Sequence, residues 1–127
     1  MERFRINRVD FVAGVGGLAP EAAALVDEHL EYYDEVLLHV LMGDLLRWGV
    51  RLFESGEADL VDRLLAWVDR GLREGDEDVE NAVAVSFIED YGGFASETPE
   101  FFAIWPEGLR AEHVRQKAWY RDHSSES

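Results

Sequence analysis

Hydrophobic residues recur through most of the chain at the three- and four-residue spacing of an α-helix. In the segment 20–33 they fall in one arc at about 100° per residue, and they are Ala22, Ala23, Leu25, Val26, Leu30 and Tyr33. The segment 57–74 has the same pattern, formed by Leu60, Val61, Leu64, Leu65, Val68 and Leu72. Both segments are predicted to be helices with one face in the core.

Two other segments are hydrophobic around most of their circumference. In 35–55 the polar residues form only a narrow stripe, which consists of Asp44, Arg47, Arg51 and Glu54. The segment 77–91 is similar and leaves little polar surface. A helix that is apolar on nearly all sides lies inside a bundle, so these two segments are the predicted central helices. We interpret the polar stripe as an internal ladder of ion pairs, with a functional floor to a concave surface as the alternative.

Caps and breakers mark the helix boundaries. Pro20 suits a first helical turn, and Gly56 and Gly75 have the position of the glycine that follows a helix. Asp76 is the expected N-cap of the next one. The predicted helices are 7–15, 20–33, 35–55, 57–74, 77–91 and 106–122, with a short helical turn near 99–104.

The predicted fold class is therefore all-α, a compact bundle of about six helices packed as antiparallel hairpins. No long stretch alternates with period two, which argues against a sheet. A short HEAT-like stack of hairpins remains an alternative. We expect a single domain over 1–122 and a frayed polar tail over 123–127.

The charge of the chain limits its partners. Its 127 residues include 27 Asp and Glu against 12 Lys and Arg, a formal net charge of −15. Such a field repels phosphate backbones and anionic lipid, so we expect no nucleic-acid partner and no membrane partner. The beginning of the chain lacks the apolar region of a signal peptide, and we expect a cytoplasmic protein.

No catalytic or metal-binding motif stands out. The chain has no cysteine, and its histidines do not pair at ligand spacing on one helix face. Asp76, Asp78 and Glu80 match only half of a calcium loop and are better explained as an N-cap with an acidic first turn. His29 is expected to be a hydrogen-bonded core residue. We therefore expect no cofactor and no enzymatic activity, with Asp44, Arg47 and His39 as the weak candidates for an enzyme.

The acidic residues offer a candidate docking surface. Glu28, Glu31 and Glu35 are expected on one side of the helix 20–33, opposite its apolar arc. This is either a solvated face or a site for a basic partner, since acidic faces speed association with cationic proteins. Near an aromatic stretch, the further candidate partner-binding residues are Glu89, Asp90, Glu97, Phe101 and Trp105. The aromatic stretch is expected to pack over the core, and its rings would be interface anchors if partly exposed, either for another protein or in a homodimer.

Two sequence blocks carry a resemblance to a family. Met42-Gly43-Asp44-Leu45-Leu46-Arg47-Trp48 and the segment 80–89, Glu-Asn-Ala-Val-Ala-Val-Ser-Phe-Ile-Glu, resemble blocks of a family of small uncharacterised acidic all-helical bacterial domains. Members of that family are similar to toxin-immunity proteins in size, acidity and single-domain form. The resemblance implies a cytoplasmic inhibitor of a secreted toxin, and it assigns no functional residues.

The expected function is that of a non-enzymatic acidic binding protein. Its first form is an immunity protein that binds and neutralises a cognate basic bacterial toxin, guided by electrostatic steering. The alternative is a small helical-repeat scaffold or regulatory module that binds another cytoplasmic protein through a concave face.

Overall fold

The computed structural model describes residues 5–89, 91 and 99–124, with the side chains described as far as residue 122. Its helices are α1 (Arg8–Gly16), α2 (Pro20–Tyr33), α3 (Leu38–Glu54), α4 (Ala58–Glu74), α5 (Glu77–Val83), the π-helix η1 (Ala84–Glu89), α7 (Pro99–Ala103) and α8 (Glu107–Ser124). The predicted all-α fold is confirmed, and most helix ends lie within a residue or two of the predicted positions. The largest difference at a helix start is in the predicted helix 35–55, because the observed helix α3 begins at Leu38.

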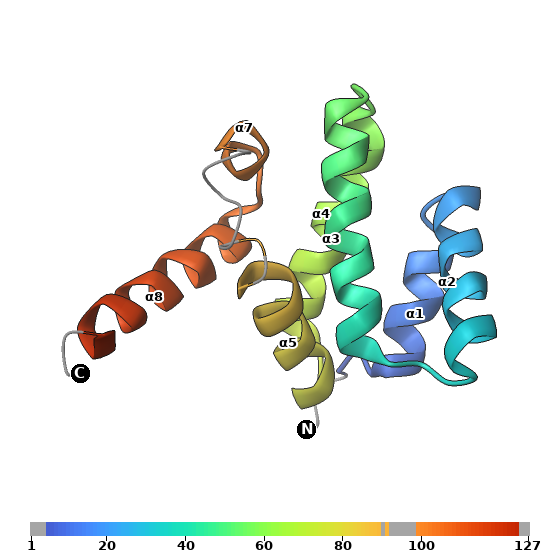
Figure 1. Ribbon diagram of the computed structural model, residues 1–127, viewed down its shortest axis with the longest axis horizontal. Helices are drawn as coiled ribbons and strands as arrows, with labels where there is room; N and C mark the ends of the chain where they lie inside the picture. The colour runs from blue at the N-terminus through green and yellow to red at the C-terminus, as the bar shows by residue number, and fades with distance from the viewer. Residues whose placement is uncertain (1–4, 90, 92–98, 125–127) are drawn as a thin grey trace.

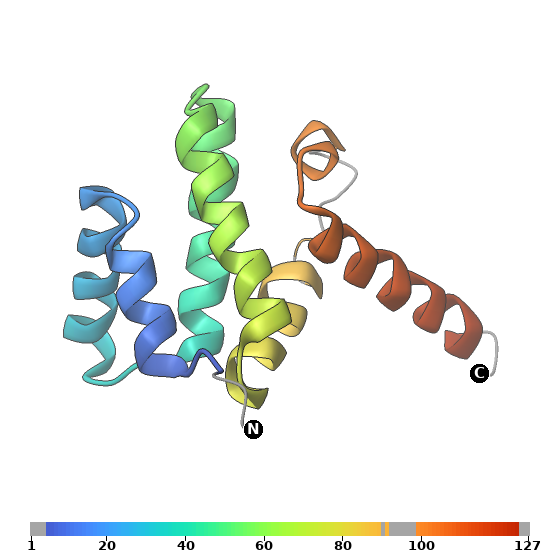
Figure 2. The same cartoon turned by 180° about the vertical axis from the view of Figure 1, so that it is seen from behind.

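The helices pack as two antiparallel hairpins with further helices beside them. Figures 1 and 2 show α1 beside α2 and α3 beside α4, while α5 lies against the α3–α4 pair. The last helix, α8, packs against η1 and α4 and lies on the opposite side of the molecule from α1 and α2. None of the helices in the described parts of the chain is long and apolar enough to cross a membrane.

The α3 helix occupies the centre, as its hydrophobic pattern predicts. It packs against α4, α5 and η1. Its buried residues are Leu38, Leu41, Met42, Gly43, Leu45, Leu46, Trp48, Gly49 and Leu52. Burying each large apolar side chain contributes about 1.5–3 kcal/mol, so α3 is the principal source of hydrophobic stabilisation in this fold.

Two glycines at helix ends have different roles. Gly56 adopts a left-handed conformation with φ of 79°, the predicted role of a glycine after a helix. Gly75 directly follows α4, as predicted, but it is not left-handed, because its φ is −74°. A Cβ at Gly75 would lie 2.3 Å from the carbonyl oxygen of Gly71. Close backbone packing therefore requires this glycine. On either side of it, the Ile6 amide donates a hydrogen bond to the Glu74 carbonyl oxygen, and the Asp76 amide donates one to the Ile6 carbonyl oxygen.

The predicted helix 77–91 is not α-helical throughout. It starts as expected, with the Asp76 carboxylate accepting a hydrogen bond from the Val79 amide at 3.0 Å. From Ala84 to Glu89 it continues as a π-helix. The wider turn changes the register of the side chains, a change that hydrophobic periodicity does not reveal.

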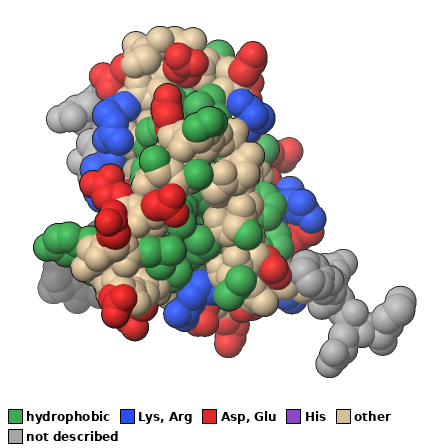
Figure 3. Space-filling model, turned by 90° about the vertical axis from the view of Figure 1, so that its right-hand side faces the viewer, with side chains coloured by type: hydrophobic (Ala, Val, Ile, Leu, Met, Phe, Trp, Pro, Cys, Tyr) green, Lys and Arg blue, Asp and Glu red, His purple; other side chains and the backbone are tan. Residues whose placement is uncertain are grey.

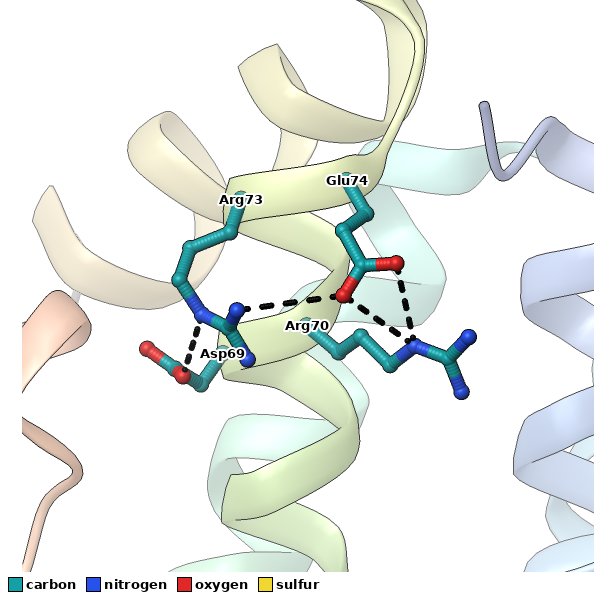
Figure 4. A network of polar contacts seen from close by, with 4 residues as sticks. All are labelled: Asp69, Arg70, Arg73 and Glu74. Atoms are coloured by element: carbon teal, nitrogen blue, oxygen red, sulfur yellow. Dashed lines mark hydrogen bonds and ion pairs between the residues drawn. The ribbon is translucent and has the colours of Figure 1, made fainter. Parts of the chain in front are cut away.

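The first turn of α8 packs closely against a buried carboxylate of α4. Asp69 is 7% exposed, and its Oδ2 accepts a hydrogen bond at 2.9 Å from Nε of Arg73. Figure 4 shows this pair joined to Glu74 and Arg70 along the last turns of α4. The other oxygen, Oδ1, lies so close to Gly108 in the first turn of α8 that a Cβ there would be 2.4 Å away. The predicted tail from 123 is corrected in part, because α8 continues to Ser124, and 125–127 lie outside the described residues.

Candidate functional site

A groove with an apolar floor and acidic sides lies where the loop between α2 and α3 meets α5. We call it the acidic groove, and it has a volume of about 400 Å³. Its lining residues are Arg8, Glu35, Val36, Leu37, Leu38, His39, Val40, Asp78 and Asn81. Figure 1 shows the loop and the start of α5 at the same end of the molecule.

The groove brings together acidic residues that are 43 positions apart in sequence. Glu35 comes from the loop after α2, and Asp78 from the first turn of α5. Arg8 of α1 lies 3.5 Å from Asp78, but their side chains are 50% and 68% exposed, so this pair is weak. A second hollow shares Asp78 and Asn81 and adds Glu77 and Glu80. Acidic residues therefore line two adjoining hollows, and Arg8 lies among them.

The chain reaches this geometry through one left-handed residue. Asp34 has a φ of 62° and ends α2 at Tyr33. Glu35 therefore does not project from α2 beside Glu28 and Glu31, and the prediction that all three share one helix side is wrong for Glu35. The left-handed turn directs the chain into the loop that lines the groove.

Glu28 and Glu31 remain on α2, where both are exposed. Figure 3 shows the side of the molecule on which α1 and α2 lie, and its Asp and Glu side chains are spread among hydrophobic and uncharged groups. Carboxylates in such an arrangement are typical of a solvated face. The acidic groove is therefore the better candidate for docking than the outer side of α2.

The sequence did not predict the contact between His39 and Ser86. His39 lies in the first turn of α3 and lines the groove. Its Nδ1 lies 2.8 Å from Oγ of Ser86 in the π-helix. Ser86 is 8% exposed and is not among the residues that line the groove. The pair therefore connects α3 to η1 beneath the groove, and a substrate in the groove would not reach the serine hydroxyl.

The other predicted partner-binding residues have different roles. Glu89 is exposed and accepts a hydrogen bond from the hydroxyl of Tyr120 at 2.7 Å, so it connects η1 to α8. This bond to Glu89 raises the pKa of Tyr120, with smaller contributions from burial and from the Glu89 charge. Asp90 and Glu97 lie outside the described residues.

Phe101 and Trp105 are not available at the surface. They are 0% and 2% exposed, and their rings lie 6.0 Å apart within a cluster that includes Tyr91 and Phe87. A partner could contact either ring only by opening the core. The prediction that they bind a partner is therefore not supported by their burial: Phe101 of α7 packs against Phe53 of α3, and Trp105 packs against Phe87 of η1.

The polar stripe of α3 is also different from its prediction. Arg47 lies 2.6 Å from Asp44, but their side chains are 58% and 38% exposed. Arg51 forms no ion pair with any described residue. The interpretation as an internal ladder is therefore wrong, because a single pair forms and it is open to water.

His29 is buried, as expected, with 4% of its surface exposed. Its Nε2 accepts a hydrogen bond from the Leu37 amide at 3.0 Å, which stabilises the loop leading into the groove. Among the described residues, no group of three His, Asp or Glu side chains is arranged to hold a metal ion.

Comparison with protein families gives a match over residues 15–122 to a family described as a domain of unknown function, DUF7674. The chain belongs to the DUF7674 family. Comparison with curated proteins gave no match, and neither did comparison with solved structures. Both sequence blocks behind the predicted resemblance lie within the matched range, which agrees with an uncharacterised helical family.

The DUF7674 match also includes most of the acidic groove. The matched range contains Glu35, the segment 36–40, Asp78 and Asn81, whereas Arg8 precedes this range. The block from Asn81 to Glu89 coincides with the end of α5 and the whole π-helix. Both acidic walls of the groove are therefore part of the DUF7674 domain.

Proposed function

We propose that this DUF7674 protein is a non-enzymatic binding protein whose acidic groove takes a basic protein partner, in the manner of an immunity protein that neutralises a toxin. The observation that carries the proposal is that Glu35 and Asp78, from distant parts of the chain, line one groove together with apolar residues of the 36–40 segment. Carboxylates steer a cationic partner and orient it, while apolar surface supplies binding energy once water is excluded.

The floor of the groove is suited to this role. Val40 is 36% exposed, and Val36 and Leu37 are partly buried. A Lys or Arg side chain has an apolar stem and a charged end. Its stem would lie on these residues while its charge meets Glu35 and Asp78. A basic toxin that inserts such a side chain would be held at this position and kept from its own target.

The first experiment identifies the partner. The full chain is immobilised and exposed to a lysate of its source organism, and bound proteins are identified by mass spectrometry. We expect one basic protein that is toxic when expressed alone and harmless when co-expressed with this chain. Capture of no basic protein, or of one without toxicity, would contradict the immunity proposal.

The second experiment locates the interface with matched variants. Glu35→Lys and Glu31→Lys change the net charge equally, but Glu35 lines the groove and Glu31 lies on α2 outside it. We expect Glu35→Lys to weaken binding of the purified partner about tenfold, mostly through slower association. Glu31→Lys should have a much smaller effect, measured by surface plasmon resonance at two salt concentrations. Equal effects of the two variants would remove the groove as the interface.

A further inference from the structure

A separate hollow, different from the two described above, lies between α2 and α3 and shares no residue with the acidic groove. We call it the α2–α3 pocket, and its volume is about 330 Å³. Its lining residues are Leu25, Glu28, His29, Tyr32, Tyr33, Asp44, Arg47 and Arg51. One wall therefore comes from α2 and the other from the polar stripe of α3.

The pocket contains a positive and a negative charge that do not neutralise each other. Asp44 and Arg47 form an ion pair. Glu28 on α2 and Arg51 on α3 line the same pocket, but they pair neither with each other nor with another described residue. Opposite charges on facing walls that remain separate leave room for a ligand that carries both complementary charges.

His29 adds an unused hydrogen-bond donor. Its Nε2 accepts the hydrogen of the Leu37 amide, so the neutral ring carries its own proton on Nδ1. Nδ1 is buried and has no hydrogen-bond partner. Leaving a buried donor unsatisfied is costly, and a ligand with an acceptor atom at this place would satisfy it.

Aromatic side chains complete the pocket. The Tyr33 ring lies 4.9 Å from the His29 ring and 4.7 Å from the Tyr32 ring. Tyr32 is 81% exposed and Tyr33 37%. Exposed rings beside Leu25 offer contact area to an apolar or aromatic side chain.

We propose that the α2–α3 pocket binds a small zwitterion, an α-amino acid with an aromatic or apolar side chain. Its carboxylate would be held by Arg51 and the Nδ1 hydrogen of His29, and its ammonium group by Glu28. Its side chain would lie against Tyr32 and Tyr33. A simple anion would be repelled by Glu28 and Asp44, and a simple cation by Arg47 and Arg51. A zwitterion has no net charge and meets neither penalty.

The test uses three related compounds and the full-length chain. L-phenylalanine carries both charges, 3-phenylpropionate lacks the ammonium group, and 2-phenylethylamine lacks the carboxylate. Binding is followed by isothermal titration calorimetry and by amide shifts in nuclear magnetic resonance spectra. We expect phenylalanine to bind at least about tenfold more tightly than either relative, with shifts in α2 and α3, since each lost charge-assisted contact costs about that factor.

Three variants make the assignment specific. Arg51→Gln and Glu28→Gln each remove one of the unpaired charges and should weaken phenylalanine binding about tenfold. Arg63→Gln is the matched control, because Arg63 is exposed on α4 and does not line the pocket. It should bind like the wild-type protein.

The proposal fails if phenylalanine causes no shifts at millimolar concentration, or if 3-phenylpropionate or 2-phenylethylamine binds equally well. It also fails if the three variants bind alike. Glu35→Lys should bind phenylalanine like the wild-type protein, because the two sites share no residue. Failure here therefore leaves the proposed function of the acidic groove unaffected.

Discussion

The helices α3 and α8 have nearly the same length but are held in different ways. α3 has 17 residues and α8 has 18. Nine residues of α3 are buried, whereas Leu109 is the one buried residue of α8 among its described side chains. The comparison shows that the spacing of hydrophobic residues can predict a helix without predicting how it is stabilised.

Polar contacts contribute to holding α8. Beyond Leu109, Gln116 donates a hydrogen bond to the carbonyl oxygen of Ala84 at 2.9 Å, and Tyr120 donates one to Glu89. Val114 and Trp119 are 61% and 54% exposed. Net contributions of single hydrogen bonds are about 0.5–1.5 kcal/mol. We therefore expect α8 to separate from the other helices at a lower free energy than the one that unfolds α3.

The largest effect should come from a cavity in α3. Leu45 is fully buried, and Leu45→Ala should lower the free energy of unfolding by about 2–5 kcal/mol. Val114→Ala on α8 is the matched control and should change it by less than about 0.5 kcal/mol. Urea unfolding followed by circular dichroism measures both. Similar losses for the two variants would mean that α8 is as firmly packed as α3.

A smaller effect is expected where α8 joins α4. Gly108→Ala would place a Cβ 2.4 Å from Oδ1 of Asp69, and such overpacking costs about 1–3 kcal/mol. We expect faster hydrogen exchange in α8, with little change in α3. Gly16→Ala at the end of α1 has open space around the new Cβ and should be neutral or slightly stabilising.

A double variant tests the cause of that effect. Asp69→Ala removes the oxygen that the new Cβ would contact, so Gly108→Ala should cost less in the Asp69→Ala background than in the wild-type protein. Equal costs in both backgrounds would show that the Asp69 carboxylate does not determine how α8 docks.

The sequence predicted the helices well because each has its own local signals. Pro20 and Asp76 begin helices where expected, and the periodicity of 57–74 reproduces α4. The sequence could not predict the structural features that depend on contacts between distant segments. The π-helix η1 packs against α3 and α8, which are distant in sequence, and the requirement for Gly75 follows from the close approach of Gly71 and Val79.

The candidate sites were predicted less completely for the same reason. Glu35 was singled out, but its separation from Glu28 depends on the left-handed conformation of Asp34. Asp78 was explained correctly as part of an acidic first turn, and its approach to Glu35 is a tertiary feature. Phe101 and Trp105 are residue types that are common in interfaces, but both are buried, so they pack in the core.

The smallest effect concerns the pH dependence of α8 docking. His113 is half-buried beside the Phe102 ring at 4.9 Å. Burial lowers the pKa of His113 below its ordinary value of 6.5, and the nearby Lys117 lowers it further. When α8 separates, the histidine is exposed and binds a proton more readily. Docking should therefore be at full strength above about pH 6.5 and weaken as the pH falls through the lowered pKa.

Hydrogen exchange of the α8 amides at pH 7.5 and 5.5, corrected for intrinsic exchange rates, measures this effect. His113→Gln cannot take up the proton, so its α8 helix should show a smaller loss of protection at the lower pH. Lys117 lies on α8 with His113 and stays beside it when α8 separates, so Lys117→Gln is the control and should lose protection nearly as the wild-type protein does. Because other titrating groups act equally in all three proteins, the differences between them isolate His113. If the wild-type protein and His113→Gln lose protection equally, the junction between α7 and α8 does not depend on a neutral histidine.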